Sequence, residues 1–394
     1  MYHAKSTGKH SEATVNGTNG VWILAHSSHR RFPCLRFKLT SLRFIQPIYG
    51  PQEDWMRRWN HMVMTPIQTW RSDQIETIYV YEGLSNRYMA IDVREFVDTS
   101  HILYDGHPYS RPRGITTTLA MADLKGGEEI YAGYIREVTG AALKQFTGPP
   151  NELVHRTYRL ACEMYQDPTT PEESVELLKL TFKLWTAARL STLPTFIVGH
   201  SGLDMGYCTM PQSQVLAKRA AVPPFLAAQL KLTLLHHIQE TIAPNLVAKL
   251  QSMTSRSSKH TWLALYLTTF MLLHNTTLLL AHALAECRSI GGRGFVPMVR
   301  EHFHEANILL AHFHYCNRGL SPLSGDAKDC LLRVEMGLDE AKVQFIRYTR
   351  QFAKARESRW KELESEEKYE DDYFFIRQLF EDAWRPRSVR AERT

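Results

Sequence analysis

The sequence has few cysteines and lacks the short motifs that mark cofactor chemistry. Six cysteines are spread over 394 residues, and no two of them form a Cys-x-x-Cys pair. Such sparse cysteines exclude a secreted disulfide framework, so free thiols in a reducing compartment are expected. A Walker loop, a dinucleotide fingerprint, a His-Glu-x-x-His motif and a calcium loop are also missing. Cofactor chemistry therefore has no residue basis in this sequence.

A convincing targeting signal is missing too. The apolar stretch 21–25 is shorter than a signal-peptide core and lies far from Met1. The first twenty residues are polar and rich in Ser, Thr and Gly, which is typical of disorder. We therefore expect a disordered, basic and polar leader over residues 1–33.

Net charge is concentrated at the N-terminal end. Nine basic and three acidic residues precede Trp59, and nine minus three gives +6, the net charge of the whole chain. The remainder of the chain is therefore close to neutral. Any electrostatic affinity for a polyanion is expected near the N-terminus, although on charge alone a basic solvated segment without a partner is the preferred interpretation.

Residues 260–285 form a run of 26 residues without Asp, Glu, Lys or Arg, long enough to span a bilayer. However, His274, Asn275, His282 and five threonines lie within it, and so many polar groups would make a single membrane span insert weakly. The run therefore favours a helix buried on all sides inside a helical domain, and no membrane partner is expected.

Hydrophobic periodicity divides the chain into two parts. Segments 36–45, 74–82 and 87–96 alternate apolar and polar residues and are predicted strands, and segment 55–63 is a predicted amphipathic helix. After Gly126 the period changes to that of helices. Helices are predicted at 127–146, 151–165, 167–190, 223–252, 260–287, 298–317, 327–368 and 370–383.

The predicted fold class is therefore mainly α. A large all-α helical domain, residues 126–387, follows a small β-rich (α+β) module, residues 34–125, and residues 388–394 form a tail. Glycine and proline residues bound the helix predicted at 127–146, and Pro171 with two glutamates opens the helix predicted at 167–190. No repeat of 30 to 45 residues is visible, so a regular solenoid is not supported.

Two motifs suggest enzyme chemistry only weakly. A strand leading into Gly-His-Ser-Gly at 199–202 would place Ser201 as the nucleophile of a serine hydrolase. That pattern needs glycine two residues after the serine, where Leu203 stands, and no parallel α/β pattern precedes it. An ordinary loop between helices is the preferred interpretation.

Histidine is abundant, with eighteen residues, and two Glu-x-x-His pairs have the spacing seen in di-iron bundles. The pairs are Glu152 with His155 and Glu301 with His304. Because no mid-helix glutamates complete the ligand set, buried or interface histidines with hydrogen-bonded rings are expected instead. These are His236, His237, His274, His282, His302, His304, His312 and His314.

Six segments, taken in order and spacing, resemble a known family. They are RRFPCLRFKLT (30–40), ESVELLKLTFKLWTAARLST (173–192), VPPFLAAQLKLTLLHHIQ (222–239), TWLALYLTTFMLLHN (261–275), EANILLAHFHYCNRG (305–319) and DDYFFIRQLFEDAWRPR (371–387). Together they are similar to fungal transcription regulators with a six-cysteine binuclear zinc cluster. The resemblance implies a non-enzymatic nuclear protein that binds DNA through zinc and uses a long helical region for regulation.

The zinc cluster itself is almost entirely missing from this sequence. Such a cluster needs six thiolates, whereas Cys34 is the only cysteine before Cys162, so it would be at most a last ligand. Either the cluster lies outside the sequence or the protein has lost its DNA reader. We expect no zinc or other cofactor in the chain as written.

Basic residues lie next to the position of the missing cluster and could clamp DNA phosphates. They are Arg30, Arg31, Arg36, Lys38 and Arg43. Phosphate contacts read no bases, so any DNA binding would be weak, salt-sensitive and independent of sequence. The leading hypothesis is a transcription regulator that contacts DNA and regulatory proteins. A helical interaction scaffold without DNA binding is the alternative, and a Ser201 hydrolase is less favoured; the oligomeric state stays open.

Overall fold

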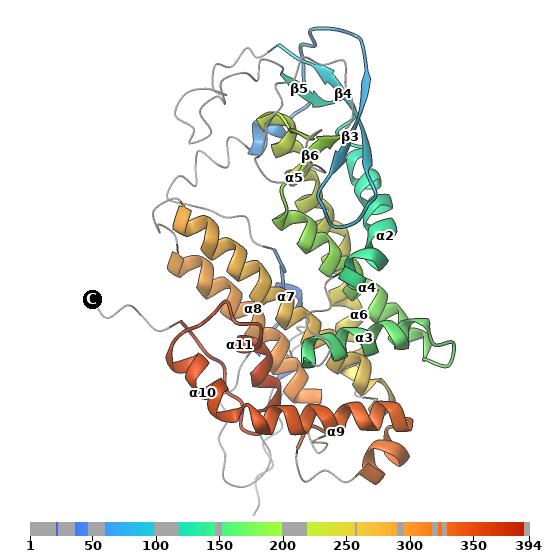
Figure 1. Cartoon of the computed structure of the whole chain (residues 1–394), viewed down its shortest axis with the longest axis vertical. Coiled ribbons are helices and arrows are strands. Elements are labelled where there is room, and N and C mark those ends of the chain that lie inside the picture. Colours follow the sequence, from blue (N-terminus) through green and yellow to red (C-terminus); the bar gives the residue numbers. More distant parts are fainter. Residues whose placement is uncertain are drawn as a thin grey trace, which may run out of the picture.

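The computed structural model describes residues 21–22, 36–45, 60–97, 118–145, 152–198, 219–256, 258–289, 295–316, 322–324 and 329–389. The molecule is elongated, with a five-stranded sheet at one end and helices extending to the other (Figure 1). The predicted mainly α fold with a small β module is confirmed. The predicted helix at 55–63 falls partly outside the described residues, and residues 60–63 are helical.

The sheet is antiparallel throughout, in the order β5-β4-β3-β6-β7. Its strands are β3 (Glu76–Tyr81), β4 (Met89–Glu95), β5 (Leu119–Met121), β6 (Phe196–Val198) and β7 (Arg219–Ala221). Alternation along β3 and β4 buries one face of the sheet, as the pattern predicted. Helices α2 (Gly127–Gln145) and α5 (Pro224–His237) pack on the sheet.

Strands β6 and β7 come from the part of the chain where only helices were predicted. Each of them has three residues, and β6 pairs with β3 through Tyr79 and Val198. The sheet is therefore shared between the two predicted domains. A single cluster of buried hydrophobic side chains also extends from Leu39 to Trp384. The boundary at residue 125 stays a prediction.

Segment 36–45 is not the strand that its alternating pattern predicted. Within it, only Arg36–Phe37 (β2) forms a paired strand, with Val21–Trp22 (β1), and Leu39–Ser41 forms a 3-10 turn. Phe44 has φ +62°, in the left-handed region, which ends any strand geometry. The backbone N–H groups of Arg43 and Phe44 bond to a side chain of a distant helix instead of a neighbouring strand.

The remaining helices follow the predicted order. They are α3 (Leu153–Gln166), α4 (Glu172–Thr192), α6 (Ala243–Arg256), α7 (Trp262–Ser289), α8 (Phe295–Cys316), α9 (Glu340–Ala355), α10 (Glu357–Ser365) and α11 (Tyr373–Ile376). Pro171 was predicted in the first turn of its helix, but it is the N-cap of α4, one position before the first helical residue, Glu172. A π-helical turn, Ile238–Ile242, joins α5 to α6 within the single helix predicted at 223–252.

The long helix predicted at 327–368 is wrong, because three separate elements occupy this range. A π-helical turn, Leu331–Glu335, ends before Gly337, whose φ of +65° breaks the helix. Asp339 then caps α9 by accepting a hydrogen bond from the Lys342 N–H at 2.9 Å. A second break at Arg356 separates α9 from α10.

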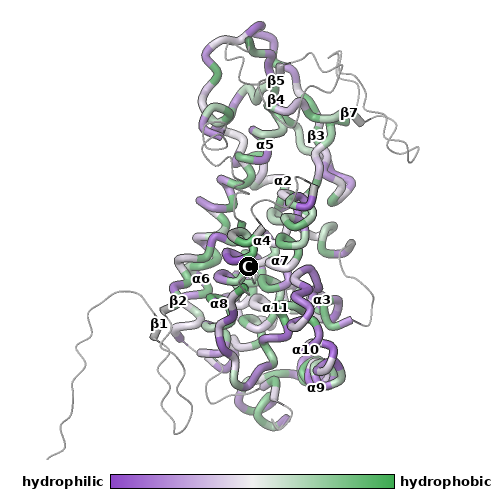
Figure 2. The backbone as a smooth tube through the Cα atoms, turned by 90° about the vertical axis from the view of Figure 1, so that its left-hand side faces the viewer, coloured by the Kyte–Doolittle hydropathy of each residue, from purple (hydrophilic) through white to green (hydrophobic). Residues whose placement is uncertain are grey.

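Helix α7 lies in the centre of the helical part, and the hydrophobic residues along it are surrounded by neighbouring helices (Figure 2). By length and composition the stretch Lys259–Arg288 could cross a membrane, but 94% of its most apolar window is buried inside the protein. Thr268 receives a hydrogen bond from the Thr181 hydroxyl, while Thr269 bonds to its own helix backbone. The prediction of a buried helix is confirmed over this window, whereas Ala285 and Arg288 in the last turns are exposed.

The last described segment, residues 381–389, crosses α8 without regular secondary structure. The Asn307 side chain donates to the Arg387 carbonyl at 2.7 Å and accepts from the Arg387 N–H at 3.0 Å. The Trp384 ring stacks on His314, with ring centres 5.3 Å apart. Helix α8 therefore holds this segment by polar and aromatic contacts.

Candidate functional site at the docked basic segment

Residues 36–45, hereafter the strap, lie against α6 and α8 (Figure 2). Its apolar side chains Leu39, Leu42, Phe44 and Ile45 are each at most 5% exposed and join the main hydrophobic cluster. Between them, the side chains of Lys38 and Arg43 are exposed. The strap thus has one face buried against the helices and another that presents positive charge to solvent.

Three polar side chains from the helical part fix the backbone of the strap. Oε1 of Glu305, on α8, accepts the N–H groups of Arg43 at 3.1 Å and Phe44 at 2.8 Å. Gln239 donates from Nε2 to the Ile45 carbonyl at 3.3 Å. Nε2 of His312, two turns further along the same face of α8, lies 3.2 Å from the Phe37 carbonyl. These bonds replace the partners that a neighbouring strand would supply.

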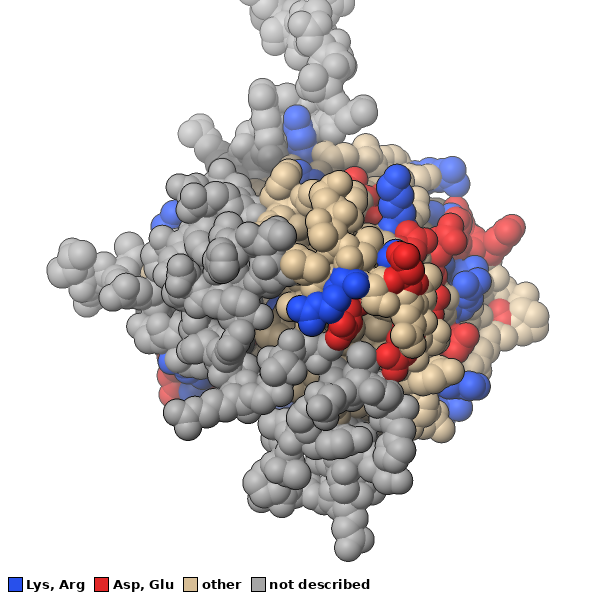
Figure 3. Space-filling view, turned by 90° about the horizontal axis from the view of Figure 1, so that it is seen from above, with Lys and Arg blue, Asp and Glu red and all other residues tan. Residues whose placement is uncertain are grey.

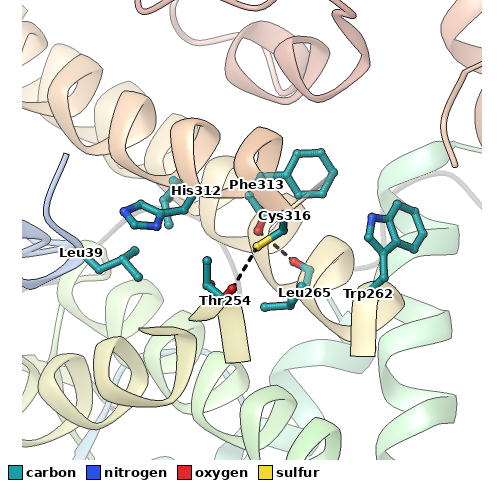
Figure 4. Close-up of a pocket in the computed structure, with 9 residues that line it drawn as sticks. Leu39, Thr254, Trp262, Leu265, His312, Phe313 and Cys316 are labelled. Atoms are coloured by element: carbon teal, nitrogen blue, oxygen red, sulfur yellow. Dashed lines mark hydrogen bonds between the residues drawn. The ribbon is translucent and has the colours of Figure 1, made fainter. Parts of the chain in front are cut away.

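His312 also lines a small cavity beneath the strap (Figure 4). The cavity has a volume of about 20 Å³ and lies between the strap, α6, α7 and α8. Leu39 contributes one wall from the strap, and Trp262 and Phe313 contribute aromatic walls from α7 and α8. Burial lowers the pKa of His312, which favours the neutral ring.

The residues predicted to contact phosphate are only partly within the described chain. Arg30, Arg31 and Cys34 lie outside the described residues, and for Arg36 the structure describes the backbone but not the side chain. Lys38 and Arg43 both lie in the strap, and both side chains are exposed. Their roles, like that of Cys34 as a zinc ligand, stay predictions.

The end of the molecule that carries the five-stranded sheet has charges of both signs. Viewed from the sheet end, described Lys and Arg side chains lie among Asp and Glu side chains (Figure 3). Arg94, for example, pairs with Asp73 at 2.7 Å and lies over the Trp70 ring. Because these charges of opposite sign lie close together, their electric fields largely cancel. The described surface at this end therefore does not attract a polyanion as a uniformly basic surface would.

Among the histidines predicted to be buried or at an interface, His274, His312 and His314 have hydrogen-bonded rings, whereas the side chains of His236 and His304 are exposed. His274 is 1% exposed, with Nδ1 2.9 Å from the Tyr158 hydroxyl and Nε2 3.3 Å from Asp372. The Nε2 of His314 lies 2.9 Å from the Gln378 carbonyl. His302 is buried as well, which lowers its pKa to about 4. These contacts connect helices rather than form a ligand set.

Neither Glu-x-x-His pair forms a metal centre in the described part of the chain. Glu152 accepts a hydrogen bond from Tyr373 at 2.8 Å and pairs with Arg356 at 3.0 Å. His304 contacts the Phe37 ring of the strap. Among the described residues, no three His, Cys, Asp or Glu side chains gather where they could hold a metal ion.

Ser201 lies outside the described residues, but the strand before it is described. Strand β6 is antiparallel to both of its neighbours, whereas a nucleophile elbow follows a strand of a parallel sheet. The sheet therefore gives Ser201 none of the expected structural context.

Sequence reasoning missed Glu305 and a second buried carboxyl group, Glu82. Glu82 is 4% exposed at the end of β3, and desolvation raises its pKa to about 7, against the weaker effect of a hydrogen bond with Tyr134. The chain turns at once after it, at Gly83 with φ +79°. An acidic residue at the end of an alternating strand gave no signal that it would be buried.

The fold combines a helical body and a small antiparallel sheet with a docked segment whose basic side chains are exposed. The chain belongs to the KpeA transcription factor family, whose family model matches residues 50–379. No curated protein and no solved structure matched the chain. The match supports the transcription-factor part of the resemblance, and the matched range includes α8 with Glu305 and His312 but begins after the strap.

Proposed function

We propose that this protein is a non-enzymatic, nuclear transcription regulator related to the fungal zinc-cluster regulators. The helical body acts as the regulatory part, and the basic residues of the strap and the segment before it contact DNA phosphates. Membership of a transcription factor family supports the general role. The observation that carries the proposal is the strap itself, which holds Lys38 and Arg43 outward on a backbone fixed by Glu305.

The proposed DNA contact is electrostatic. A fixed backbone lowers the conformational entropy lost when basic side chains bind phosphate, so the strap is a better platform than a free tail. Phosphate contacts carry no sequence information, and each contact contributes about 0.9 to the slope of log affinity against log salt. Binding through the strap is therefore weak, salt-sensitive and the same for unrelated duplexes.

The test measures binding of the full chain to an arbitrary DNA duplex by fluorescence anisotropy at several salt concentrations. The double variant Lys38→Ala with Arg43→Ala should reduce the slope by about 1.8, the value for two contacts. The matched control is Arg71→Ala with Lys354→Ala, which removes the same two charge types from exposed positions elsewhere. Binding that persists undiminished at high salt, or an equal loss in the control, would contradict the proposal.

Zinc content tests a separate part of the proposal. Cys34 is the only cysteine before Cys162, and one thiolate cannot hold zinc with useful affinity. We expect purified protein to contain no tightly bound zinc after dialysis, measured by atomic absorption. Two molar equivalents of zinc would show that a cluster forms from other residues.

One observation favours the alternative of a protein-interaction scaffold. Tyr79 and Tyr88 are 52% and 53% exposed on the sheet end, and the rings of Tyr81 and Tyr88 lie 5.5 Å apart. Exposed tyrosines are enriched at protein interfaces. If the strap variants leave DNA binding unchanged while Tyr79→Ser abolishes capture of a transcription-machinery protein, the scaffold explains the chain better.

A further inference from the structure

The cavity beneath the strap has walls from four separate parts of the chain (Figure 4). Leu39 comes from the strap, Thr254 from α6, Leu265 and Thr269 from α7, and Cys316 from α8. Its volume of about 20 Å³ is close to the space that one water molecule needs. Because Leu39 is the wall contributed by the strap, movement of this one side chain would enlarge the cavity.

Most polar groups in the cavity wall have partners on the main chain. The Thr269 hydroxyl donates to the Leu265 carbonyl at 2.8 Å, and the Cys316 thiol lies 3.8 Å from the Thr254 carbonyl. His312 differs. Its Nδ1 is buried and has no hydrogen-bond partner among the described residues, and the whole residue is 6% exposed.

The contact of His312 with the strap fixes which ring nitrogen carries the proton. The Phe37 carbonyl can only accept, so Nε2 carries the hydrogen and donates it. Burial disfavours a second proton, which leaves Nδ1 as an acceptor. A buried acceptor without a donor is destabilising, so a molecule that donates a hydrogen bond here would be stabilised.

We propose that this cavity is a binding site for a small apolar molecule with one hydroxyl group, of the size and chemistry of a phenol. Trp262, Leu265 and Phe313 supply apolar and aromatic walls, and the described residues that line the cavity include no carboxylate, lysine or arginine. The hydroxyl donates to His312 Nδ1. The aromatic ring takes the place of the Leu39 side chain, which moves out with residues 39–45 of the strap while the Phe37 carbonyl stays bonded to His312.

The same histidine therefore connects ligand binding to strap docking. His312 holds the Phe37 carbonyl with one nitrogen and the ligand with the other, and Leu39 and the ligand compete for one space. Occupation of the cavity loosens the strap. The consequence for DNA contact rests on the proposed function, whereas the ligand site does not, and its test uses no DNA.

The first experiment compares phenol with benzene on the full-length protein, by ligand-observed NMR titration. We expect phenol to bind about five- to tenfold more tightly, the usual net contribution of one hydrogen bond. Leu39→Ala should strengthen binding of both compounds by opening the cavity. Leu42→Ala is the matched control, because Leu42 is equally buried on the strap but does not line the cavity. Equal binding of phenol and benzene, absence of binding, or an equal gain in Leu42→Ala would overturn the proposal.

The second experiment removes the hydrogen-bond acceptor, Nδ1 of His312, and leaves Leu39 unchanged. His312→Phe should abolish the preference for phenol over benzene, provided that its circular dichroism melt shows a folded protein; a retained preference would overturn the role of His312.

In the wild-type protein, phenol should accelerate hydrogen exchange at the Arg43 and Phe44 amides, which Glu305 protects. Unchanged exchange at saturating phenol would overturn the displacement of the strap.

Discussion

Replacing Glu305 with alanine is the most direct test of how the strap is held. The Oε1 atom of this residue, which is 2% exposed, accepts the N–H groups of both Arg43 and Phe44. Alanine removes the acceptor, so the buried Phe44 N–H and the partly buried Arg43 N–H both lose their hydrogen-bond partner. A neighbouring strand could not accept these two N–H groups in place of Glu305, because Phe44 has a left-handed backbone conformation that regular strand pairing does not allow.

The magnitude follows from the two lost bonds. An unsatisfied buried donor costs about 1–3 kcal/mol, and the Arg43 N–H is only partly buried, so we expect a loss of about 2–4 kcal/mol of docking free energy. At about 1.4 kcal/mol per factor of ten, opening of the strap becomes roughly 30- to 700-fold more frequent. Glu305→Gln keeps one carbonyl oxygen as acceptor and should retain most of the docking.

Native-state hydrogen exchange at the Arg43 and Phe44 amides is the appropriate assay, because the strap can open without unfolding of the helical body. Amides of the buried helix α7 report global unfolding in the same experiment. Glu301→Ala is the matched control, since Glu301 lies about one turn away on α8 with an exposed side chain. If Glu305→Ala accelerates exchange no more than Glu301→Ala does, the strap is held by its apolar side chains and the reasoning is wrong.

Three further predictions concern other parts of the fold. The pKa of Glu82 is raised from 4.5 to about 7, so its stabilising neutral form is fully present below pH 4.5 and is lost as the pH rises through 7. Denaturation at pH 5 and pH 8 should show a fall of about 3 kcal/mol across that window from this group, which Glu82→Gln lacks; parallel curves for both proteins would contradict it. Gly140→Ala should stabilise the protein by about 0.5–1 kcal/mol, because an added Cβ in α2 meets no atom within 4 Å. Gly127→Ala should instead destabilise it by about 1–3 kcal/mol, because its Cβ would lie 2.7 Å from Met121 and 2.9 Å from Thr233; chemical denaturation that ranks the two variants in the opposite order would refute this. Trp384→Ala should cost about 3–5 kcal/mol and expose residues 381–389 to proteases, unless the Asn307 contacts alone hold that segment, in which case limited proteolysis would be unchanged.

The elements that the sequence predicted well are those whose signal is local. Helix α2 lies between glycine and proline residues, β3 and β4 alternate over six and seven residues, and α7 is apolar along most of its length. In each case the local residue pattern is enough to identify the element, without information about what the element packs against. Burial of α7 also follows locally, because its two histidines, its asparagine and its threonines are too polar for lipid.

The elements that the sequence could not predict depend on partners far away in the chain. The Phe44 N–H meets Glu305 across 261 residues, and nothing in the alternation of segment 36–45 indicates that its backbone bonds to a side chain. Strand β6 has only three residues and becomes a strand because β3 lies beside it. The acceptor role of His312 is likewise set by the Phe37 carbonyl, 275 residues earlier.

The position of β6 has a consequence for synthesis of the protein on the ribosome. Strand β3 emerges early and pairs with β4 at once, but its other edge waits for Val198, the partner of Tyr79, 119 residues later. During that interval an unpaired strand edge beside Tyr79 is available to other nascent chains. A fragment that stops before β6 should therefore aggregate, whereas a chain that includes β6 and β7 covers that edge with its own backbone.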